Sequence, residues 1–573
     1  MLQTLTTPRG ETLSGTPWQV YPRPQMRRDS YINLNGEWDF AVSREEPATF
    51  DMRITVPFCP ESRLSGIGRH FEEGAPLWYR RRFLLPEGFR RERVLLHIGA
   101  ADQIAEVFVN GQYLCRHEGG YASFCVDITE ALAEENELVI RCTDDLHDQA
   151  FPYGKQVTNR GGMWYTPVSG IWQTVWLESV PGTYIENLNI ENHGASVTIS
   201  TVPPLEGTVS VEPLGQFPLE NGQVTIAPEN PHFWCPDDPY LYHFTLETAQ
   251  DKVESYFAIR SLEIKKVGEY PRLCLNGKPY FFHGLLDQGY WPEGLLTAPA
   301  PESYADDILA MKRLGFNTLR KHIKVEPEEF YYQCDRLGMI VWQDMVNNGS
   351  YSYFRDTVLP TVGIQKRNDR RLHRDERSRN AFRQGAADAV NQLKNHPCIC
   401  YWTIFNEGWG QFDGDRVCGW FRTLDATRFI DATSGWFRGK NTDVDSRHQY
   451  FGKLRLTGDG LRPLVLSEFG GKTWRVEGHI FNSDKTYGYG ACPTREALNE
   501  AVATLYRESI VPAVERGLCA AIYTQVSDVE DEVNGLATYD RRVVKLDADT
   551  MLPISRALQD AMEKTVASFE KMG

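Results

Sequence analysis

Two glutamates stand at the ends of short apolar runs in the second half of the chain. Glu407 ends ICYWTIFNE (399–407), and Glu468 lies near the end of PLVLSEF (463–469). Burying a carboxylate there is costly unless the group is paired or hydrogen-bonded, so each glutamate either caps its strand, pairs with an arginine or does chemistry. Two opposed carboxylates can hydrolyse a glycoside: one, kept protonated, donates to the leaving oxygen, and the other attacks the anomeric carbon.

Both runs belong to a series of eight predicted strands that alternate with helical patterns in residues 267–573. The strands are predicted at 280–284, 317–322, 339–344, 399–407, 431–435, 446–451, 463–469 and 519–525. Eight strand–helix units over about 300 residues predict a (β/α)8 TIM barrel, whose active site lies at the C-terminal strand ends. We therefore expect Glu407 and Glu468 to face one cavity with their carboxyl groups within ~6 Å, too close for an intervening water.

Two β-rich regions precede the barrel. Residues 1–180 show short strands and turn signals, including Asn110-Gly111 between apolar runs, and predict a sugar-binding-like jelly-roll β-sandwich. Residues 181–266 continue the pattern at the size of an immunoglobulin-like β-sandwich. The expected fold is thus multidomain, with an N-terminal jelly roll, an immunoglobulin-like sandwich and a C-terminal TIM barrel.

The composition narrows the partners of the chain. Its formal net charge of -16 repels a polyanion, so nucleic acid is not expected as a partner. No run of 18 apolar residues suits a membrane, and the first 15 residues lack a secretory signal, so a cytoplasmic location is expected. The closely spaced Cys398 and Cys400 are interpreted as packing residues of a strand rather than metal ligands.

Eight motifs in order carry a family resemblance. They are INLNGEWDF (32–40), GGYASFCVDIT (119–129), GIWQTVWLE (170–178), LNGKPYFFHG (275–284), GFNTLRKH (315–322), CDRLGMIVWQD (334–344), WTIFNEG (402–408) and LSEFGG (466–471). With them the chain resembles glycoside hydrolase family 2, which contains β-galactosidases, β-glucuronidases and β-mannosidases. The resemblance covers nearly the whole length.

The resemblance implies roles for five residues. Glu407 matches the family's general acid/base, and Glu468 matches its nucleophile. Arg320 would hold the nucleophile ionised, Asn406 would hydrogen-bond the sugar 2-hydroxyl, and Tyr450 would touch the nucleophile. No metal and no organic cofactor is expected, because the oxocarbenium-like transition state needs only the two carboxylates.

Further candidates have a structural alternative. Three polar residues at strand ends either line the sugar site or hold loop backbone: His322, Asp344 and Asp287. Aromatic rings stack on flat apolar faces of ligands, and three tryptophans are candidate platforms, although Trp402 could equally be core packing: Trp409, Trp402 and Trp436.

The motifs leave the sugar open. β-Glucuronidases of the family read the sugar carboxylate with an Asn-x-Lys pair after strand eight, but here Asn534 is followed by Leu536. The preferred prediction is therefore a β-galactosidase-like, retaining, exo-acting enzyme on a carbohydrate or glycoside substrate, with a homo-oligomer left open. The alternative is a β-glucuronidase or other uronide-cleaving enzyme, in which the carboxylate would be bound by Arg541, Arg542, Lys321 or Lys324.

A third possibility comes from another class of protein. The chain could be an inactive carbohydrate-binding protein with the first sandwich as its binding domain. The presence of both glutamates together with Asn406 and Arg320 argues against this, because sugar binding alone needs no opposed carboxylates.

Overall fold

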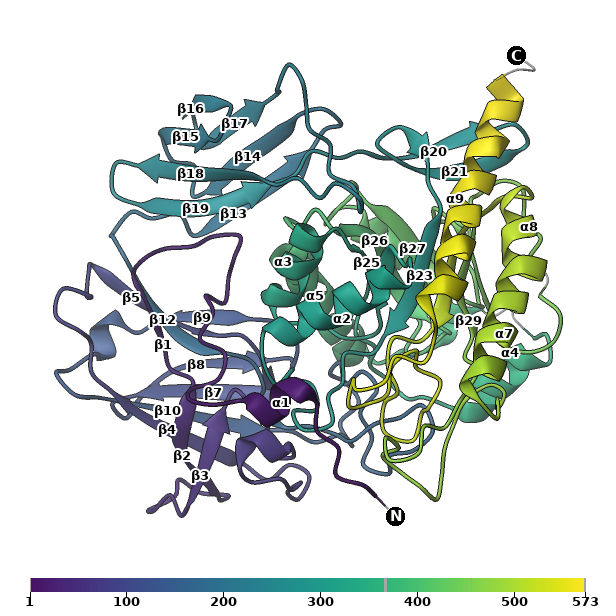
Figure 1. Cartoon of the computed structure of the whole chain (residues 1–573). Coiled ribbons are helices and arrows are strands. Elements are labelled where there is room, and N and C mark those ends of the chain that lie inside the picture. The colour runs from purple at the N-terminus through teal and green to yellow at the C-terminus, as the bar shows by residue number, and fades with distance from the viewer. Residues whose placement is uncertain (1, 365–367, 455, 571–573) are drawn as a thin grey trace.

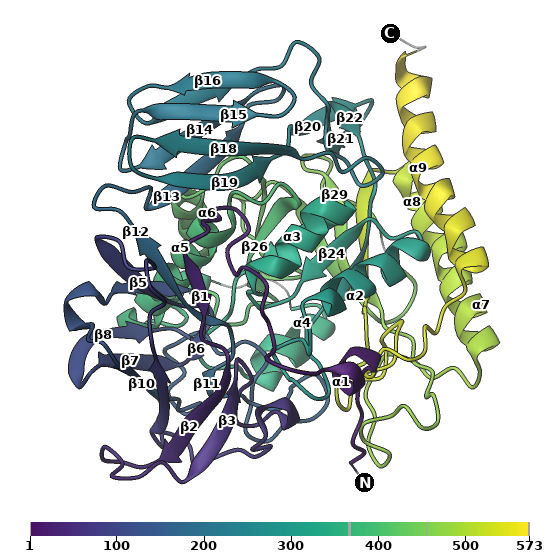
Figure 2. The same ribbon diagram turned by 60° about the vertical axis from the view of Figure 1, so that its left-hand side comes forward.

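A computed structural model describes residues 2–364, 368–454 and 456–570. Two β-sandwiches lie on one side of a barrel of parallel strands, and the long helix α9 (Ala548–Glu570) runs along the outside of the barrel (Figure 1). Figure 2 shows the second sandwich stacked above the first. Among the described residues we find no helix with the length and hydropathy needed to span a membrane.

The first sandwich consists mainly of two antiparallel sheets. One has the order β1 (Tyr31–Asn33), β12 (Val175–Val180), β5 (Arg93–Ile98) and β9 (Phe124–Asp127). The other has the order β3 (Met52–Val56), β2 (Gly36–Val42), β4 (Leu77–Phe83), β10 (Asn136–Thr143), β7 (Ile104–Val109) and β8 (Gln112–Glu118). Alternate residues of β10 are buried, as expected for a strand with one face on the core.

The second sandwich is smaller. Its three-stranded sheet contains β13 (Asn187–Asn192), β14 (Val197–Val202) and β17 (Gln223–Ile226). Its four-stranded sheet contains β16 (Gly215–Leu219), β15 (Gly207–Val211), β18 (Tyr242–Thr248) and β19 (Lys252–Phe257). The two sheets enclose a separate apolar core.

A buried arginine joins the two sandwiches. Arg28 Nη1 lies 2.8 Å from an oxygen of Glu178 on β12, and its Nη2 lies 2.6 Å from an oxygen of Asp251, next to β19. The same Nη2 donates to the carbonyl of Ile185 at 2.7 Å. This cluster fixes how the second sandwich sits on the first.

We expect Arg28→Met to cost about 3 kcal/mol, because it leaves buried carboxylates short of a partner. The first transition in differential scanning calorimetry should shift to lower temperature. Arg82→Met is the matched control: its side chain is 73% exposed and lies 3.2 Å from Glu137, so its loss should stay below ~1 kcal/mol. Equal shifts in the two variants would contradict the role of the buried cluster.

The barrel contains all eight predicted strands. They are β23 (Phe282–Asp287), β24 (Thr318–Lys321), β25 (Ile340–Asp344), β26 (Ile399–Asn406), β27 (Phe429–Ser434), β28 (Asp445–Gln449), β29 (Leu464–Gly470) and β30 (Leu518–Thr524). Hydrogen-bonded neighbours are parallel in the order β27-β26-β25-β24-β23-β30-β29-β28. The barrel is nearly closed, since only the ends β27 and β28 share no ladder. The predicted fold class is confirmed.

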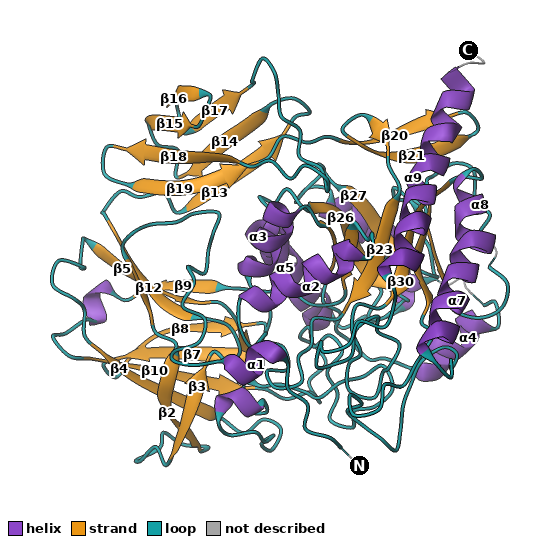
Figure 3. Cartoon of the chain, in the orientation of Figure 1, coloured by secondary structure: helices purple, strands orange, loops and turns teal. Residues whose placement is uncertain are grey.

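Helices surround these strands, whereas the two sandwiches are almost entirely strands and loops (Figure 3). The principal barrel helices are α2 (Glu302–Arg313), α3 (Glu328–Leu337), α5 (Glu376–Leu393), α6 (Gly414–Phe421) and α7 (Arg495–Leu505), besides α9. Asp375 caps α5 by accepting from the backbone N–H groups of Arg377 and Ser378. Gly338 ends α3 at φ 71°, where a Cβ atom would lie 2.4 Å from the carbonyl of Pro236, so glycine is required there. A small hairpin sheet, β20 (Leu262–Val267), β21 (Tyr270–Leu275) and β22 (Lys278–Pro279), precedes β23.

Candidate active site

Glu407 directly follows β26 in an unusual backbone conformation. Its φ is 52°, a left-handed value that costs energy for a non-glycine residue. Strain of this kind tends to cluster at functional sites. Its N–H donates to the carbonyl of Ser434 at 3.0 Å, and its own carbonyl accepts from Trp436 Nε1 at 3.1 Å. Hydrogen bonds at both the N–H and the carbonyl therefore hold the strained backbone of Glu407, so the point from which its buried side chain projects is fixed.

Glu468 lies on β29 and is held by two residues. Arg320 Nη1, from β24, lies 3.0 Å from Glu468 Oε1 and also donates to the carbonyl of Ser467 at 3.0 Å. The hydroxyl of Tyr450 donates to the other oxygen, Oε2. Both interactions favour the carboxylate form and fix its orientation.

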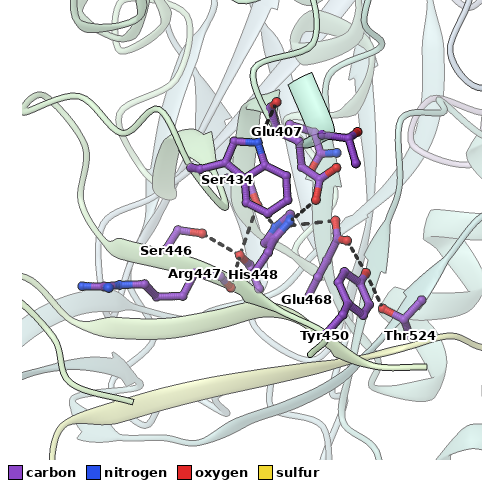
Figure 4. A network of polar contacts seen from close by, with 12 residues as sticks. Glu407, Ser434, Ser446, Arg447, His448, Tyr450, Glu468 and Thr524 are labelled. Atoms are coloured by element: carbon purple, nitrogen blue, oxygen red, sulfur yellow. Dashed lines mark hydrogen bonds and ion pairs between the residues drawn. The ribbon is translucent and has the colours of Figure 1, made fainter. Parts of the chain in front are cut away.

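His448 lies between the two glutamates (Figure 4). Its Nδ1 is 2.8 Å from Glu407 Oε1, and its Nε2 is 3.6 Å from Glu468 Oε1. Nε2 is also hydrogen-bonded to Ser434 Oγ at 2.7 Å, across the open seam between β28 and β27. Through this geometry an oxygen of Glu407 and an oxygen of Glu468 lie within 4.8 Å of one another, inside the expected ~6 Å.

The environments separate the pKa values of the two glutamates. Burial and the nearby charge of Glu468 raise the pKa of Glu407, against the hydrogen bond from His448. Burial would also raise the pKa of Glu468, but His448, Arg320 and His322 outweigh it and lower the pKa to about 2. Two carboxyl groups whose pKa values are driven apart can serve as acid and as nucleophile.

A pocket opens above these groups. The barrel contributes Leu286, Gln288, His322, Asn406, Glu407, Trp409, Tyr450, Glu468, Tyr489, Thr524 and Glu532, and the first sandwich contributes Lys155 and Met163. Asn406 Oδ1 accepts from Arg320 Nη2 at 2.8 Å, which orients the amide. Its Nδ2 has no hydrogen-bond partner within the described part of the chain, so it is available to a ligand hydroxyl.

The two predicted aspartates do not line this pocket. Asp344 accepts from Arg320 Nε at 3.0 Å and is 2.6 Å from His322 Nδ1. It thus orients His322, which lines the pocket, and Arg320, which holds Glu468. Asp287 lies 2.6 Å from Lys321 Nζ and accepts from the N–H of Gly289 at 3.0 Å. Asp287 therefore holds loop backbone, which is the structural alternative considered for it. Asp344 instead orients the side chains of Arg320 and His322.

The three tryptophans have different environments. Trp409 lines the pocket and stacks on Trp164 at a centroid distance of 5.2 Å. Trp436 donates from Nε1 to the backbone carbonyl of Glu407 at 3.1 Å. Trp402 is fully buried and donates to Asp425 at 2.9 Å, which is core packing.

One cluster near the pocket has ligand types that suit a metal: Glu407, His448 and Glu468. The guanidinium of Arg320 lies 3.0 Å from Glu468 Oε1 and 3.4 Å from His448 Nε2, so a cation bound there would meet a fixed positive charge. The donor set therefore fits the acid and nucleophile roles better than a metal site. Cys398 and Cys400 are buried without a disulfide and belong to no such cluster among the described residues.

Several residues of the pocket region were not predicted from the sequence, among them His448, Lys155 and Glu532. His448 lies two positions before Tyr450, on the same face of the predicted strand 446–451, so the strand period could have indicated it. Lys155 and Glu532 come from loops of different domains, and no local pattern marks them.

The chain is a multidomain barrel protein with a two-carboxylate site. Its two β-sandwiches precede a (β/α)8 barrel, and the opposed glutamates stand after the fourth barrel strand and on the seventh. Family models for glycosyl hydrolases family 2 match all three parts of the chain: the galactose-binding domain-like model at 69–161, the family 2 model at 183–260 and the TIM barrel model at 266–453. The chain belongs to glycosyl hydrolase family 2.

The proteins to which this chain is similar are named either β-galactosidase or β-glucuronidase. The chain is 24% identical over 357 residues to a β-galactosidase of Thermoanaerobacter pseudethanolicus and 22% identical over 407 residues to a β-glucuronidase of Bacteroides fragilis. These matches cover 57% and 66% of this chain but only 44% and 56% of those relatives. A solved β-glucuronidase from an uncultured Clostridium species has the same fold, with a TM-score of 0.70, 18% identity, and 96% of this chain and 100% of that chain covered.

Proposed function

We propose that the protein is a retaining, exo-acting β-glycoside hydrolase in which Glu407 is the general acid/base and Glu468 the nucleophile. The observation that carries this proposal is the pair of buried carboxylates, with oxygens within 4.8 Å and pKa values shifted in opposite directions. Retaining enzymes hold their carboxyl groups ≈ 5–5.5 Å apart, whereas inverting enzymes need ≈ 6.5–9.5 Å for a water.

The residues divide the reaction into two displacements. In the first, Glu468 attacks the anomeric carbon while Glu407 gives its proton to the departing glycosidic oxygen. In the second, Glu407 removes a proton from water, which attacks the same carbon and releases Glu468. Arg320 and Tyr450 hold Glu468 in line, and the free N–H of Asn406 is suited to a hydroxyl next to the reacting carbon.

Exo action fits the shape of the pocket. Lys155 and Met163 of the first sandwich line it together with barrel residues, among them Trp409, which stacks on Trp164. A pocket enclosed by two domains in this way suits one terminal sugar rather than the middle of a chain. A β-galactosidase-like enzyme remains the preferred proposal, with a uronide-cleaving enzyme as the second candidate because similar proteins carry β-glucuronidase names.

A panel of nitrophenyl glycosides tests the proposed reaction. It contains the β-D-galactoside, β-D-glucuronide, β-D-mannoside, β-D-glucoside and α-L-arabinoside. The wild-type protein should release nitrophenol from at least one, and Glu468→Gln should reduce that rate by at least ~10³-fold, because an amide is a poor nucleophile. Equal release by wild type and variant would contradict the assignment.

The pKa shifts predict an asymmetric pH profile. Glu468 must be ionised, so its pKa of about 2 leaves activity intact until strongly acidic pH. Glu407 must be protonated for the first displacement, so kcat/KM should fall as pH rises through its raised pKa. This alkaline limb should be clear for a phenyl glycoside and weak for a dinitrophenyl glycoside, whose leaving group needs no proton. An identical limb for both substrates would show that another group titrates.

A further inference from the structure

A lysine of the first sandwich reaches the catalytic pocket of the barrel. The N–H of Tyr153 donates to the carbonyl of Asn347 at 3.1 Å, and its hydroxyl donates to the carbonyl of Gly349 at 2.8 Å. The carbonyl of Lys155 then accepts from the N–H of Tyr165 at 3.0 Å. This docking brings Lys155, only 5% exposed, into the pocket wall.

The ammonium of Lys155 is free to bind a ligand. It lies 4.9 Å from the centroid of the Trp409 ring, and no hydrogen bond or ion pair within 4.0 Å joins it to a residue that the structure describes. A buried cation without such a partner is costly. A polar group of the bound sugar would supply the missing interaction.

A carboxylate faces the same pocket from the loop after β30. Glu532 is 2% exposed, and it accepts from the hydroxyl of Tyr165 at 2.5 Å and from Asn534 Nδ2 at 3.0 Å. Burial raises the pKa of Glu532, while the charge of Lys155 and these donors oppose the rise. The charges of Glu532 and Lys155 each shift the pKa of the other group, but the carboxylate oxygens and the ammonium nitrogen are more than 4.0 Å apart.

The other basic residues considered for a sugar carboxylate are already engaged. Lys321 lies 2.8 Å from Glu326, and Lys324 lies 2.9 Å from the same residue. Arg541 pairs with Asp307, and Arg542 pairs with Glu11. None of the four lines the pocket. Arg320, behind the pocket wall, is shared between Glu468 and Asp344. Lys155 is the one lysine or arginine among the residues that line the pocket in the described part of the chain.

These charges disfavour a second anion. A sugar carboxylate bound by Lys155 would share the pocket with Glu532 and Glu468, and like charges in a desolvated site repel strongly. A hydroxyl group meets no such conflict, because it accepts from an ammonium and donates to a carboxylate at the same time.

We propose that Lys155 and Glu532 together read the hydroxyl groups of a neutral terminal sugar, and that Glu532 excludes a uronic acid. The inference rests on the proposed glycosidase function and names its substrate class. It also gives the first sandwich a direct part in selecting the substrate, through Lys155.

Matched nitrophenyl glycosides test this selection. The neutral β-D-glucoside and β-D-galactoside are compared by kcat/KM with the corresponding glucuronide and galacturonide. The wild-type enzyme should favour the neutral member of at least one pair by ~100-fold or more. Glu532→Gln should raise the uronide-to-neutral ratio at least 10-fold, and Lys155→Met should lower kcat/KM for the neutral member by ~10²-fold.

Lys266 is exposed, and Lys266→Met is the matched control. It should change neither the uronide-to-neutral ratio nor kcat/KM for the neutral substrate. Wild-type preference for a uronide, an unchanged ratio in Glu532→Gln, or an unaffected neutral substrate in Lys155→Met would overturn the proposal.

A binding measurement separates this proposal from the proposed reaction. Saturation-transfer NMR on Glu468→Gln, with free glucose, galactose and their uronic acids, reports sugar selection without turnover. Neutral sugars should bind in preference, and Lys155→Met added to this variant should abolish their signals. Preferred binding of the uronic acids would overturn the selection, whereas neutral binding by a protein inactive on every glycoside would leave the selection standing and refute only the hydrolase function.

Discussion

Glu468→Ala should reduce kcat by at least ~10⁴-fold for every glycoside that the wild-type protein hydrolyses, because the covalent intermediate can no longer form. The loss should not depend on the leaving group, since even an excellent one needs an attacking group. Azide should restore part of the activity by occupying the vacated space and attacking directly. Its product should be the glycosyl azide of inverted configuration, identified by the anomeric proton coupling in NMR.

Glu477→Ala provides the matched control for this loss. Glu477 is an exposed glutamate nine residues further along the chain, and its removal should leave kcat within twofold, as is usual for a surface change. A Glu468→Ala enzyme that kept its activity, or that gave the retained azide, would contradict the nucleophile assignment.

Glu407→Ala should affect substrates according to their leaving groups. General acid catalysis contributes ~10²–10⁴-fold, so phenyl and alkyl glycosides should lose this factor in kcat/KM. A dinitrophenyl glycoside, whose leaving group needs no proton, should be nearly unaffected in the first displacement. Its intermediate should then accumulate, because Glu407 is also needed to activate water, and stopped-flow absorbance should show a burst followed by slow turnover.

Azide distinguishes the two glutamates in this variant as well. With Glu407→Ala, azide needs no general base, so it should attack the covalent intermediate and give the glycosyl azide of retained configuration. Interchanged products between the two variants would mean that the roles are reversed. A uniform loss for all leaving groups would mean that Glu407 acts in some way other than by proton donation.

The barrel could be predicted because its signals are local. Most of the strands are short apolar runs next to a helical pattern. Even 431–435 and 446–451, which contain few apolar residues, are recovered as β27 and β28, although no described helix separates β27, β28 and β29. Glu407 and Glu468 stand out for a related reason: an acidic residue that ends an apolar strand conflicts with burial, and conflicts of this kind concentrate at functional sites.

The walls of the pocket could not be predicted in the same way. His448 reaches both glutamates only because β28 ends opposite β27 at the open seam of the barrel. Lys155 enters from another domain, and its position depends on contacts between residues nearly 200 positions apart, such as Tyr153 with Gly349. The four basic residues considered for a sugar carboxylate lie outside the pocket, because each forms an ion pair with an acidic residue. The sequence alone does not show these ion pairs.

A mechanism-based label tests whether Glu468 forms a covalent bond to the sugar. A 2-deoxy-2-fluoro glycoside with a dinitrophenyl leaving group forms the intermediate but slows its hydrolysis, because fluorine destabilises the oxocarbenium-like transition state. The sugar is chosen from the best substrate of the panel, and the labelled protein is digested and sequenced by mass spectrometry. We expect one sugar per chain, attached to Glu468. Attachment to Glu407 or another residue, or turnover of the label without any adduct, would show that Glu468 is not the nucleophile.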